Sequence, residues 1–90
     1  MNIRIPGLLR SYTGGEAQVA IELARESPTL ADALESLNER SPGLRFRIID
    51  EQGAIRAHIK IFVDGVLARD LETPVRPDGE LMIVGALSGG

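Results

Sequence analysis

His58-Ile59-Lys60-Ile61-Phe62-Val63-Asp64-Gly65-Val66-Leu67 carries the clearest strand signal in the chain, and the other elements are placed around it. Its side chains alternate between the two faces of a strand: Ile59, Ile61 and Val63 lie on one face, and His58, Lys60 and Phe62 lie on the other. Asp64-Gly65 is a tight-turn dipeptide. We therefore predict a strand over residues 58–63, a reversal of the chain at residues 64–65, and a continuation through residues 66–67.

Weaker strand signals come earlier in the chain. Residues 1–5 and 19–23 alternate apolar and polar side chains, and Thr13-Gly14-Gly15 between them is a strong turn signal. We predict that these two strands form a hairpin. Residues 46–50 and 55–59 flank a polar stretch with one glycine, which we interpret as a second hairpin or an extended excursion.

One main helix is predicted to begin near residue 28. Thr29 as N-cap, with Asp32 three residues on, approximates a capping box, although Ser27 followed by Pro28 is an alternative start. The apolar residues of the helix fall on one face: Leu30, Ala33, Leu34 and Leu37. Ser41-Pro42-Gly43 ends the helix. With one helix for four or five strands, we predict an α+β domain in which the helix covers a single face of the sheet.

The sheet face away from that helix is predicted to be apolar as well. A last strand over residues 80–84 has apolar side chains on both faces. If the helix covers Leu81 and Ile83, then Met82 and Val84 face solvent beside Phe62 of the neighbouring strand. An exposed apolar patch on a small monomer often marks a docking surface. We predict that Phe62, Met82 and Val84 bind a partner; the alternative is that loops cover both faces of a central last strand.

The composition indicates one small globular domain. The 90 residues are 43% hydrophobic and 26% charged, with a net charge of −3, and no apolar stretch approaches the ~20 residues of a membrane span. The N-terminus lacks the long apolar segment of a signal peptide, and the chain has no cysteine. With two phenylalanines, one tyrosine and no basic run, base stacking on nucleic acid is not expected. We expect a cytoplasmic protein that binds neither nucleic acid nor membrane.

No catalytic, cofactor-binding or metal-binding group is predicted among the side chains. His58 is the only histidine, and no two carboxylates bracket it at metal-ligand spacing. Gly14-Gly15 lacks the lysine and the hydroxyl residue of a phosphate-binding loop. We therefore expect that the chain binds no cofactor or metal and is not an enzyme. If it takes part in chemistry, it does so as a substrate or carrier.

The sequence ends in Ser88-Gly89-Gly90 shortly after the last strand. Glycine has no β-carbon, so two glycines pass through a channel too narrow for other residues. The α-carboxylate of Gly90 is ionised at neutral pH and is able to attack an activated phosphate. We predict a folded domain over residues 1–84 and a flexible tail over residues 85–90. In this tail Gly90 is the reacting residue and Gly89 supplies the clearance; the alternative is a frayed chain end.

These features together resemble one known family. The helix start at residues 28–34, the Asp78-Gly79 turn before the last strand, and the Leu87-Ser88-Gly89-Gly90 ending are similar to the ubiquitin-like β-grasp sulfur carriers of the MoaD and ThiS type. Residues 5–10 and 46–63 look most like the CysO-type carriers of cysteine biosynthesis. The resemblance spans essentially the whole chain. It implies a ubiquitin-like β-grasp fold, with a mixed four- to five-stranded sheet and one main helix on one face.

The resemblance also implies a mechanism. An E1-like, ATP-using enzyme adenylates the Gly90 carboxylate, and a sulfur donor then displaces AMP to leave a C-terminal thiocarboxylate. A second enzyme accepts this sulfur, for example a cysteine synthase acting on an activated serine. ATP is thus used by the activating partner and is not bound by this chain. Leu87 and Ser88 are expected to contact the partner together with the apolar sheet face.

Three other functions stay open at this point. The small subunit of molybdopterin synthase uses the same end chemistry, with the large subunit as the acceptor. A ubiquitin-like protein modifier joins Gly90 to lysine side chains through isopeptide bonds. A plain interaction domain has a tail without any function.

Overall fold

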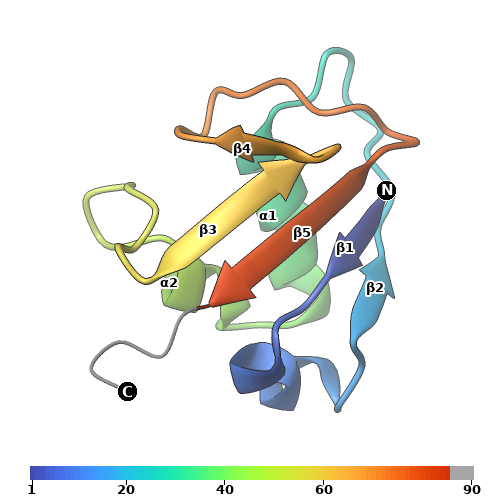
Figure 1. The fold of residues 1–90 in the computed structure, drawn as a ribbon. Coiled ribbons are helices and arrows are strands. Elements are labelled where there is room, and N and C mark those ends of the chain that lie inside the picture. Colours follow the sequence, from blue (N-terminus) through green and yellow to red (C-terminus); the bar gives the residue numbers. More distant parts are fainter. Residues whose placement is uncertain (86–90) are drawn as a thin grey trace.

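The computed structural model describes residues 1–85, which form a five-stranded sheet with β5 in its centre (Figure 1). The strands lie in the order β2-β1-β5-β3-β4. Their bounds are Asn2–Arg4 for β1, Gln18–Ala20 for β2, Ile59–Val63 for β3, Val66–Ala68 for β4 and Glu80–Gly85 for β5. β1 runs parallel to β5, and the other three neighbouring pairs are antiparallel. The sheet is therefore mixed, as the resemblance implies.

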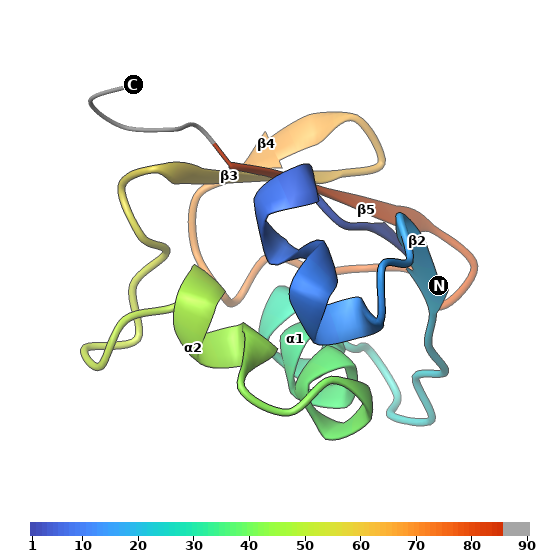
Figure 2. The ribbon, with the colours of Figure 1, turned by 90° about the horizontal axis from the view of Figure 1, so that it is seen from below.

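Helices cover one face of this sheet, as Figure 2 shows. They are the 3-10 helix η1 (Gly7–Thr13), the main helix α1 (Leu30–Arg40) and the short helix α2 (Leu44–Ile48). Over residues 1–85, none of the helices combines the length and the apolar character that crossing a membrane requires. The predicted α+β architecture with one main helix on one sheet face is confirmed, and two short helices accompany the main one.

The hydrophobic core lies between α1 and the inner face of the sheet. The four residues predicted to share one face of the helix are all fully buried: Leu30, Ala33, Leu34 and Leu37. The strand residues predicted to face them are at most 2% exposed: Ile59, Ile61, Leu81 and Ile83. Burying one side chain of this size contributes roughly 1.5–3 kcal/mol. This layer of contacts therefore fixes which face of the sheet turns inward.

The reversal between β3 and β4 is a two-residue turn at the predicted Asp64-Gly65. Both residues have positive φ, 48° and 85°, as in a type I′ turn, whose twist matches that of the strands. The Asp64 carboxylate also accepts a hydrogen bond of 2.9 Å from the backbone N–H of Glu80. The turn places Leu67 directly opposite Phe62. Asp64-Gly65 thus sets the β3–β4 register, and the Asp64 side chain also anchors the start of β5.

α1 begins at the predicted capping box. The Thr29 side chain accepts the backbone N–H of Asp32 at 3.5 Å, and the Asp32 carboxylate accepts the backbone N–H of Thr29 at 2.8 Å. This backbone hydrogen bond, helped by the Thr29 hydroxyl and the nearby Arg25, holds the pKa of Asp32 below its ordinary value of 3.8. Because folding lowers this pKa, ionised Asp32 stabilises the fold at neutral pH. That contribution is lost as the pH falls below about 4 and through the folded-state pKa.

The segment predicted as a strand from residue 46 is helical instead. α2 follows Gly43, whose φ of 93° is left-handed. The Asn38 side chain of α1 accepts hydrogen bonds of 3.1 Å from the N–H groups of Gly43 and Arg45. Leu44 and Ile48, four residues apart, are both fully buried. Contacts with the rest of the fold therefore impose this short helix on residues whose local pattern resembles a strand.

The remaining differences from the sequence prediction concern boundaries and one connection. The first two strands pair antiparallel as predicted, but η1 lies between them and β2 spans residues 18–20 rather than 19–23. Ile49 and Ile55 form an isolated bridge that closes the excursion between them. β5 extends to Gly85, which pairs with Ile59. The sheet therefore continues one residue beyond the predicted domain boundary at residue 84.

Thr29→Ala is expected to destabilise the fold by about 1 kcal/mol, because one N–H at the start of α1 loses its acceptor. For a domain of this size, this change lowers the Tm by roughly 4–8 °C. Thermal unfolding followed by circular dichroism measures the shift. Thr29→Ser retains the hydroxyl group and should unfold close to the wild-type temperature. An equal loss in both variants would show that the hydroxyl is not the stabilising group.

Candidate functional site

The site predicted from the sequence lies where the central strand β5 ends. Gly85 is the last residue of β5 and also the last residue that the structure describes. The predicted site residues Leu87, Ser88, Gly89 and Gly90 belong to residues 86–90, which lie outside the described residues, and they stay predictions. Residues 86–90 are called the tail below. The structure does describe the surface that surrounds the start of this tail.

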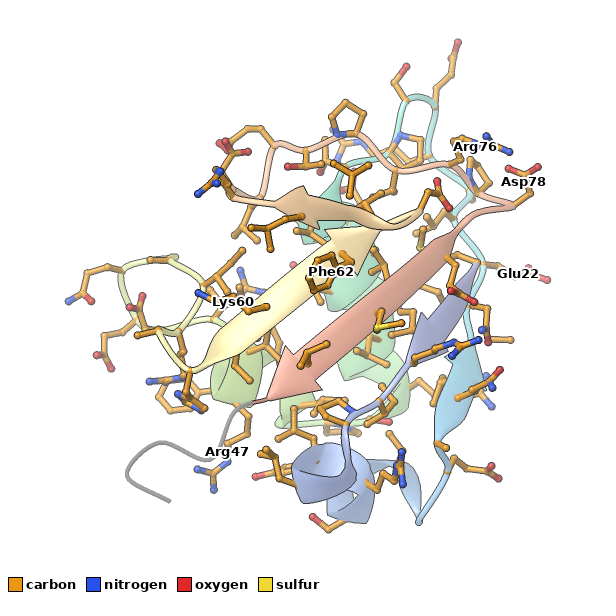
Figure 3. All side chains as sticks on the ribbon, viewed as in Figure 1. Glu22, Arg47, Lys60, Phe62, Arg76 and Asp78 are labelled. Carbon is orange, nitrogen blue, oxygen red and sulfur yellow. The ribbon has the colours of Figure 1, made fainter. Side chains whose placement is uncertain are left out.

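The outer face of the sheet, opposite the helices, carries the three predicted partner-binding residues. Phe62 pairs with Met82 across β3 and β5, and Lys60 pairs with Val84. Val84 is 38% exposed, and Phe62 and Met82 are half-buried. Figure 3 shows Phe62 on the sheet face that points away from the helices. The predicted position of these side chains on the outer face is confirmed, while their role in binding a partner stays a prediction.

Leu67 of β4 belongs to the same outer face and was not among the predicted site residues. It is 37% exposed and lies opposite Phe62. The signal for it was present in the sequence, because a two-residue turn at Asp64-Gly65 places the second residue after the turn opposite Phe62. Leu67, Phe62, Met82 and Val84 together are called the apolar patch below. The patch spans three adjacent strands and reaches the last residue before Gly85.

Gly85, the residue before the tail, is closely packed against η1. A β-carbon built on Gly85 would lie 2.6 Å from Cδ2 of Leu8 and 3.6 Å from Cδ1 of Ile59. Leu8 is itself 42% exposed. Beside it lies an open hollow of about 320 Å³, called the exit hollow below and lined by Leu8, Leu9, Ser11, Tyr12, Arg47 and His58. Gly85 therefore serves here as a residue of close approach, and not as the flexible exit that glycine alone suggests.

Charged side chains lie near both ends of β5, paired at its start and all basic near its end. At its start, Arg76 and Asp78 form an exposed ion pair of 3.3 Å (Figure 3). The hydrogen bond that Arg76 donates lowers the pKa of Asp78, and the positive charge of Arg76 is the second cause of this shift. Nearby, the Glu80 carboxylate forms an ion pair with Arg4, with 3.4 Å between the oxygen and Nε. Near the other end of β5, Lys60 of the adjacent β3 pairs with Val84, and Arg47 of α2 lines the exit hollow together with Leu8 (Figure 3).

The described residues offer surfaces for binding. In residues 1–85, no three histidine, aspartate or glutamate side chains are grouped to hold a metal ion. His58 lines the exit hollow together with Arg47 and Tyr12. Another open hollow, of about 600 Å³, lies between β2 and α1 and is lined by Ala20, Ile21, Glu22, Ser36, Glu39 and Arg40. What the described site can do is present an apolar surface next to the tail.

A model of the ThiS family matches residues 3–90 of the chain. The match therefore includes both the folded domain and the tail. Among curated proteins, no sequence matches the chain.

Solved structures resemble the chain over nearly its whole length. A chain of the BexX/CysO complex from Amycolatopsis orientalis has a TM-score of 0.84 and 26% identity, with coverage of 99% of this chain and 98% of that chain. SAMP1 from Haloferax volcanii has a TM-score of 0.83 and 26% identity, covering 100% of this chain and 98% of that chain. CysO from Mycobacterium tuberculosis has a TM-score of 0.80 and 24% identity, with coverage of 96% of this chain and 98% of that chain. At this identity the likeness is evidence for the fold only. The ubiquitin-like β-grasp fold is thereby confirmed.

Gly85→Ala is expected to change the free energy of unfolding by about 0.5 kcal/mol or less. The new β-carbon displaces only the end of the Leu8 side chain, which lies at the surface. Chemical unfolding gives the free energy, and methyl NMR of Leu8 reports the displacement.

The contrasting variant is Gly79→Ala. Its β-carbon would lie 2.9 Å from both carboxylate oxygens of Asp64 and 3.2 Å from the carbonyl oxygen of Arg76. It should cost about 1 kcal/mol or more, because Asp64 must give up its hydrogen bond to Glu80. A loss of the same size in Gly85→Ala would mean that Leu8 is held rigidly and would contradict the prediction.

Proposed function

The chain belongs to the ThiS family, and we propose that it is a sulfur carrier, a protein cosubstrate that partner enzymes act upon. The observation that carries this proposal is the extent of the family match, which runs to residue 90 and so includes Gly89 and Gly90. The apolar patch beside the start of the tail supports it, because a carrier needs a docking surface close to its reacting end. The absence of cysteine agrees with sulfur carried on an end group.

The proposed reaction takes place at the α-carboxylate of Gly90. One carboxylate oxygen attacks the α-phosphate of ATP bound to an E1-like partner, pyrophosphate leaves, and an acyl-adenylate forms. A sulfide sulfur then attacks the acyl carbon and AMP leaves with the oxygen that it received. The product is a thiocarboxylate in which sulfur replaces one oxygen of Gly90. This chain supplies the carboxylate, while the partner binds ATP.

In this proposal the folded domain binds the partner and the tail carries the reacting group, and the length of the tail allows this. Five residues in extended conformation reach about 17 Å. That length takes Gly90 into a buried channel of the partner while the domain stays outside. The apolar patch then supplies the affinity, and the two glycines without β-carbons supply the clearance at the channel's end.

For the sulfur acceptor, we propose an enzyme of cysteine biosynthesis. The support is the likeness at 26% identity to a chain of the BexX/CysO complex, together with the CysO-type sequence features at residues 5–10 and 46–63. The alternative acceptor is the large subunit of a molybdopterin synthase. Both acceptors use the same thiocarboxylate, so the acceptor question is separate from the carrier question.

A second candidate function is protein modification, and one observation favours it. The chain is as similar to SAMP1 of Haloferax volcanii, a small archaeal modifier protein, as to the CysO complex chain. A modifier would join its Gly90 to lysine side chains of target proteins. The chain has a single lysine, Lys60. Any chain-to-chain linkage through a lysine would therefore have to use Lys60. This residue lies on the outer face of the sheet, where it pairs with Val84.

The carrier proposal predicts a defined mass change. After incubation with an E1-like enzyme, ATP and sulfide, intact-protein mass spectrometry should show one oxygen of Gly90 exchanged for sulfur. A variant lacking Gly90 should show no exchange and should unfold at the wild-type temperature, because the buried core is built from residues between Ile3 and Ile83. Absence of the exchanged species with every sulfur donor would overturn the carrier proposal. Conjugates that survive a denaturing gel would favour the modifier function.

The docking role of the apolar patch is tested by two neighbouring residues of β4. Leu67→Ser removes an apolar side chain from the patch and is expected to weaken binding of the activating enzyme about tenfold, or about 1.4 kcal/mol. Val66→Ser makes a similar change on the adjacent residue, which is 70% exposed and points to the other face. It should bind like the wild type. Calorimetric titration measures both affinities, and equal affinities would exclude the patch as the docking surface.

A further inference from the structure

The surface around the start of the tail is basic, although the chain as a whole is acidic. The net charge of the chain is −3. Arg47 lines the exit hollow on one side of the β3 start, and Arg56 and Lys60 line a smaller hollow of about 180 Å³ on the other side. Neither lining contains an acidic side chain. Arg47, Arg56 and Lys60 are called the basic collar below.

The collar lies close to the end of β5. Ile59, the first residue of β3, pairs with Gly85, and Lys60 pairs with Val84. Leu8, which touches Gly85, lines the same hollow as Arg47. Cationic side chains therefore line two hollows close to Gly85, the last residue before the tail.

The three cations are not neutralised by the described part of the chain. The ion pairs formed within residues 1–85 involve other arginines: Arg4, Arg25 and Arg76. The collar arginines are instead held by neutral groups. The Arg47 guanidinium lies over the Tyr12 ring and donates to its hydroxyl group. The Arg56 guanidinium stacks on Phe46 at 4.8 Å from the ring centroid, and its Nε donates to the Phe46 carbonyl at 2.9 Å.

We propose that the basic collar recognises carboxylates placed around the mouth of the channel into which the partner enzyme takes the tail. This inference rests on the proposed carrier function and adds the chemical character of the partner's surface. The apolar patch and the collar are then two parts of one interface. The patch packs against an apolar surface of the partner, and the collar aligns the start of the tail with an acidic rim.

Physical considerations favour a role in association rate and orientation. Charges at the rim of an interface act mainly on the association rate and on its dependence on salt. Two of the three collar side chains are already ordered by stacking, so less side-chain entropy is lost when they meet a carboxylate. The carboxylates Asp78 and Glu80 lie at the start of β5, away from the collar. There they are paired with Arg76 and Arg4, so a partner with an acidic rim is attracted mainly to the tail end of the molecule.

The test compares single charge reversals that change the net charge equally. Arg47→Glu and Lys60→Glu alter the collar, and Arg76→Glu is the control at the far end of β5. Arg76 forms only an exposed ion pair, so its loss should hardly affect the fold. Stopped-flow association with the E1-like enzyme is measured for full-length proteins at about 0.05 M and about 1 M salt, where screening lengths are roughly 14 and 3 Å. Each collar variant should associate about tenfold more slowly at low salt and nearly like the wild type at high salt.

Three results would overturn the inference. The first is that the collar variants associate at the same rate as Arg76→Glu. The second is that they associate equally slowly at both salt concentrations. The third is that they lose binding to an RNA oligonucleotide and associate with the enzyme normally. Thermal unfolding of each variant identifies effects that come from lost structure, and sulfur exchange at Gly90 of the wild type is measured alongside. If the wild type is exchanged and the collar variants associate normally, the collar inference fails and the carrier function stands. If the wild type is not exchanged, the carrier function itself fails.

Discussion

The parallel pairing of β1 with β5 is the constraint on which the rest of the structure depends. It joins the two ends of the domain, with Ile3 opposite Leu81 and both side chains fully buried. A parallel pair cannot be closed by a tight turn, so everything between the two strands must cross over and return. The helix α1 and the hairpin of β3 and β4 fill that connection. Because β5 arrives last and takes the central position, the tail leaves from the middle of the sheet.

The central position of β5 explains why one small sheet can contribute to the core on one face and offer a docking surface on the other. The inner face of β5 meets α1, and its outer face is framed by β3 and β1. Strand alternation therefore assigns Leu81 and Ile83 to the core, and it assigns Met82 and Val84 to the surface. The residues that recognise a partner are thus held by the same backbone hydrogen bonds that hold the core. A docking surface built in this way needs little reorganisation when it binds.

The parts of the structure that local chemistry determines were predictable from the sequence. Thr29 and Asp32 make their capping box within four residues, and Asp64-Gly65 makes its turn within two. The outward position of Phe62, Met82 and Val84 followed from alternation along two strands. Leu67 could have been found in the same way, since the turn length fixes its partner.

The parts that were missed depend on tertiary contacts. α2 is only five residues long, too short to be stable by itself, and it forms because Asn38 binds its first N–H groups and the core accepts Leu44 and Ile48. η1 likewise lies in a segment whose local signals indicate only a turn. Leu8 and Arg47, which line the exit hollow, come from these two helices. Their position in the site could therefore not be predicted from the sequence, whereas that of the apolar patch could.

The contact between Leu8 and Gly85 has a consequence for the evolution of such chains. Positions 8 and 85 share one small volume, because a β-carbon at residue 85 would occupy the space of the leucine side chain. A single β-carbon at residue 85 needs only a shift of the Leu8 side chain, but a larger side chain there needs a smaller residue at position 8. Across relatives, these two positions should therefore co-vary in size, with a bulky residue at one accompanied by a small residue at the other. Such a pair would link the segment after the first strand to the origin of the tail in every sequence that keeps this geometry.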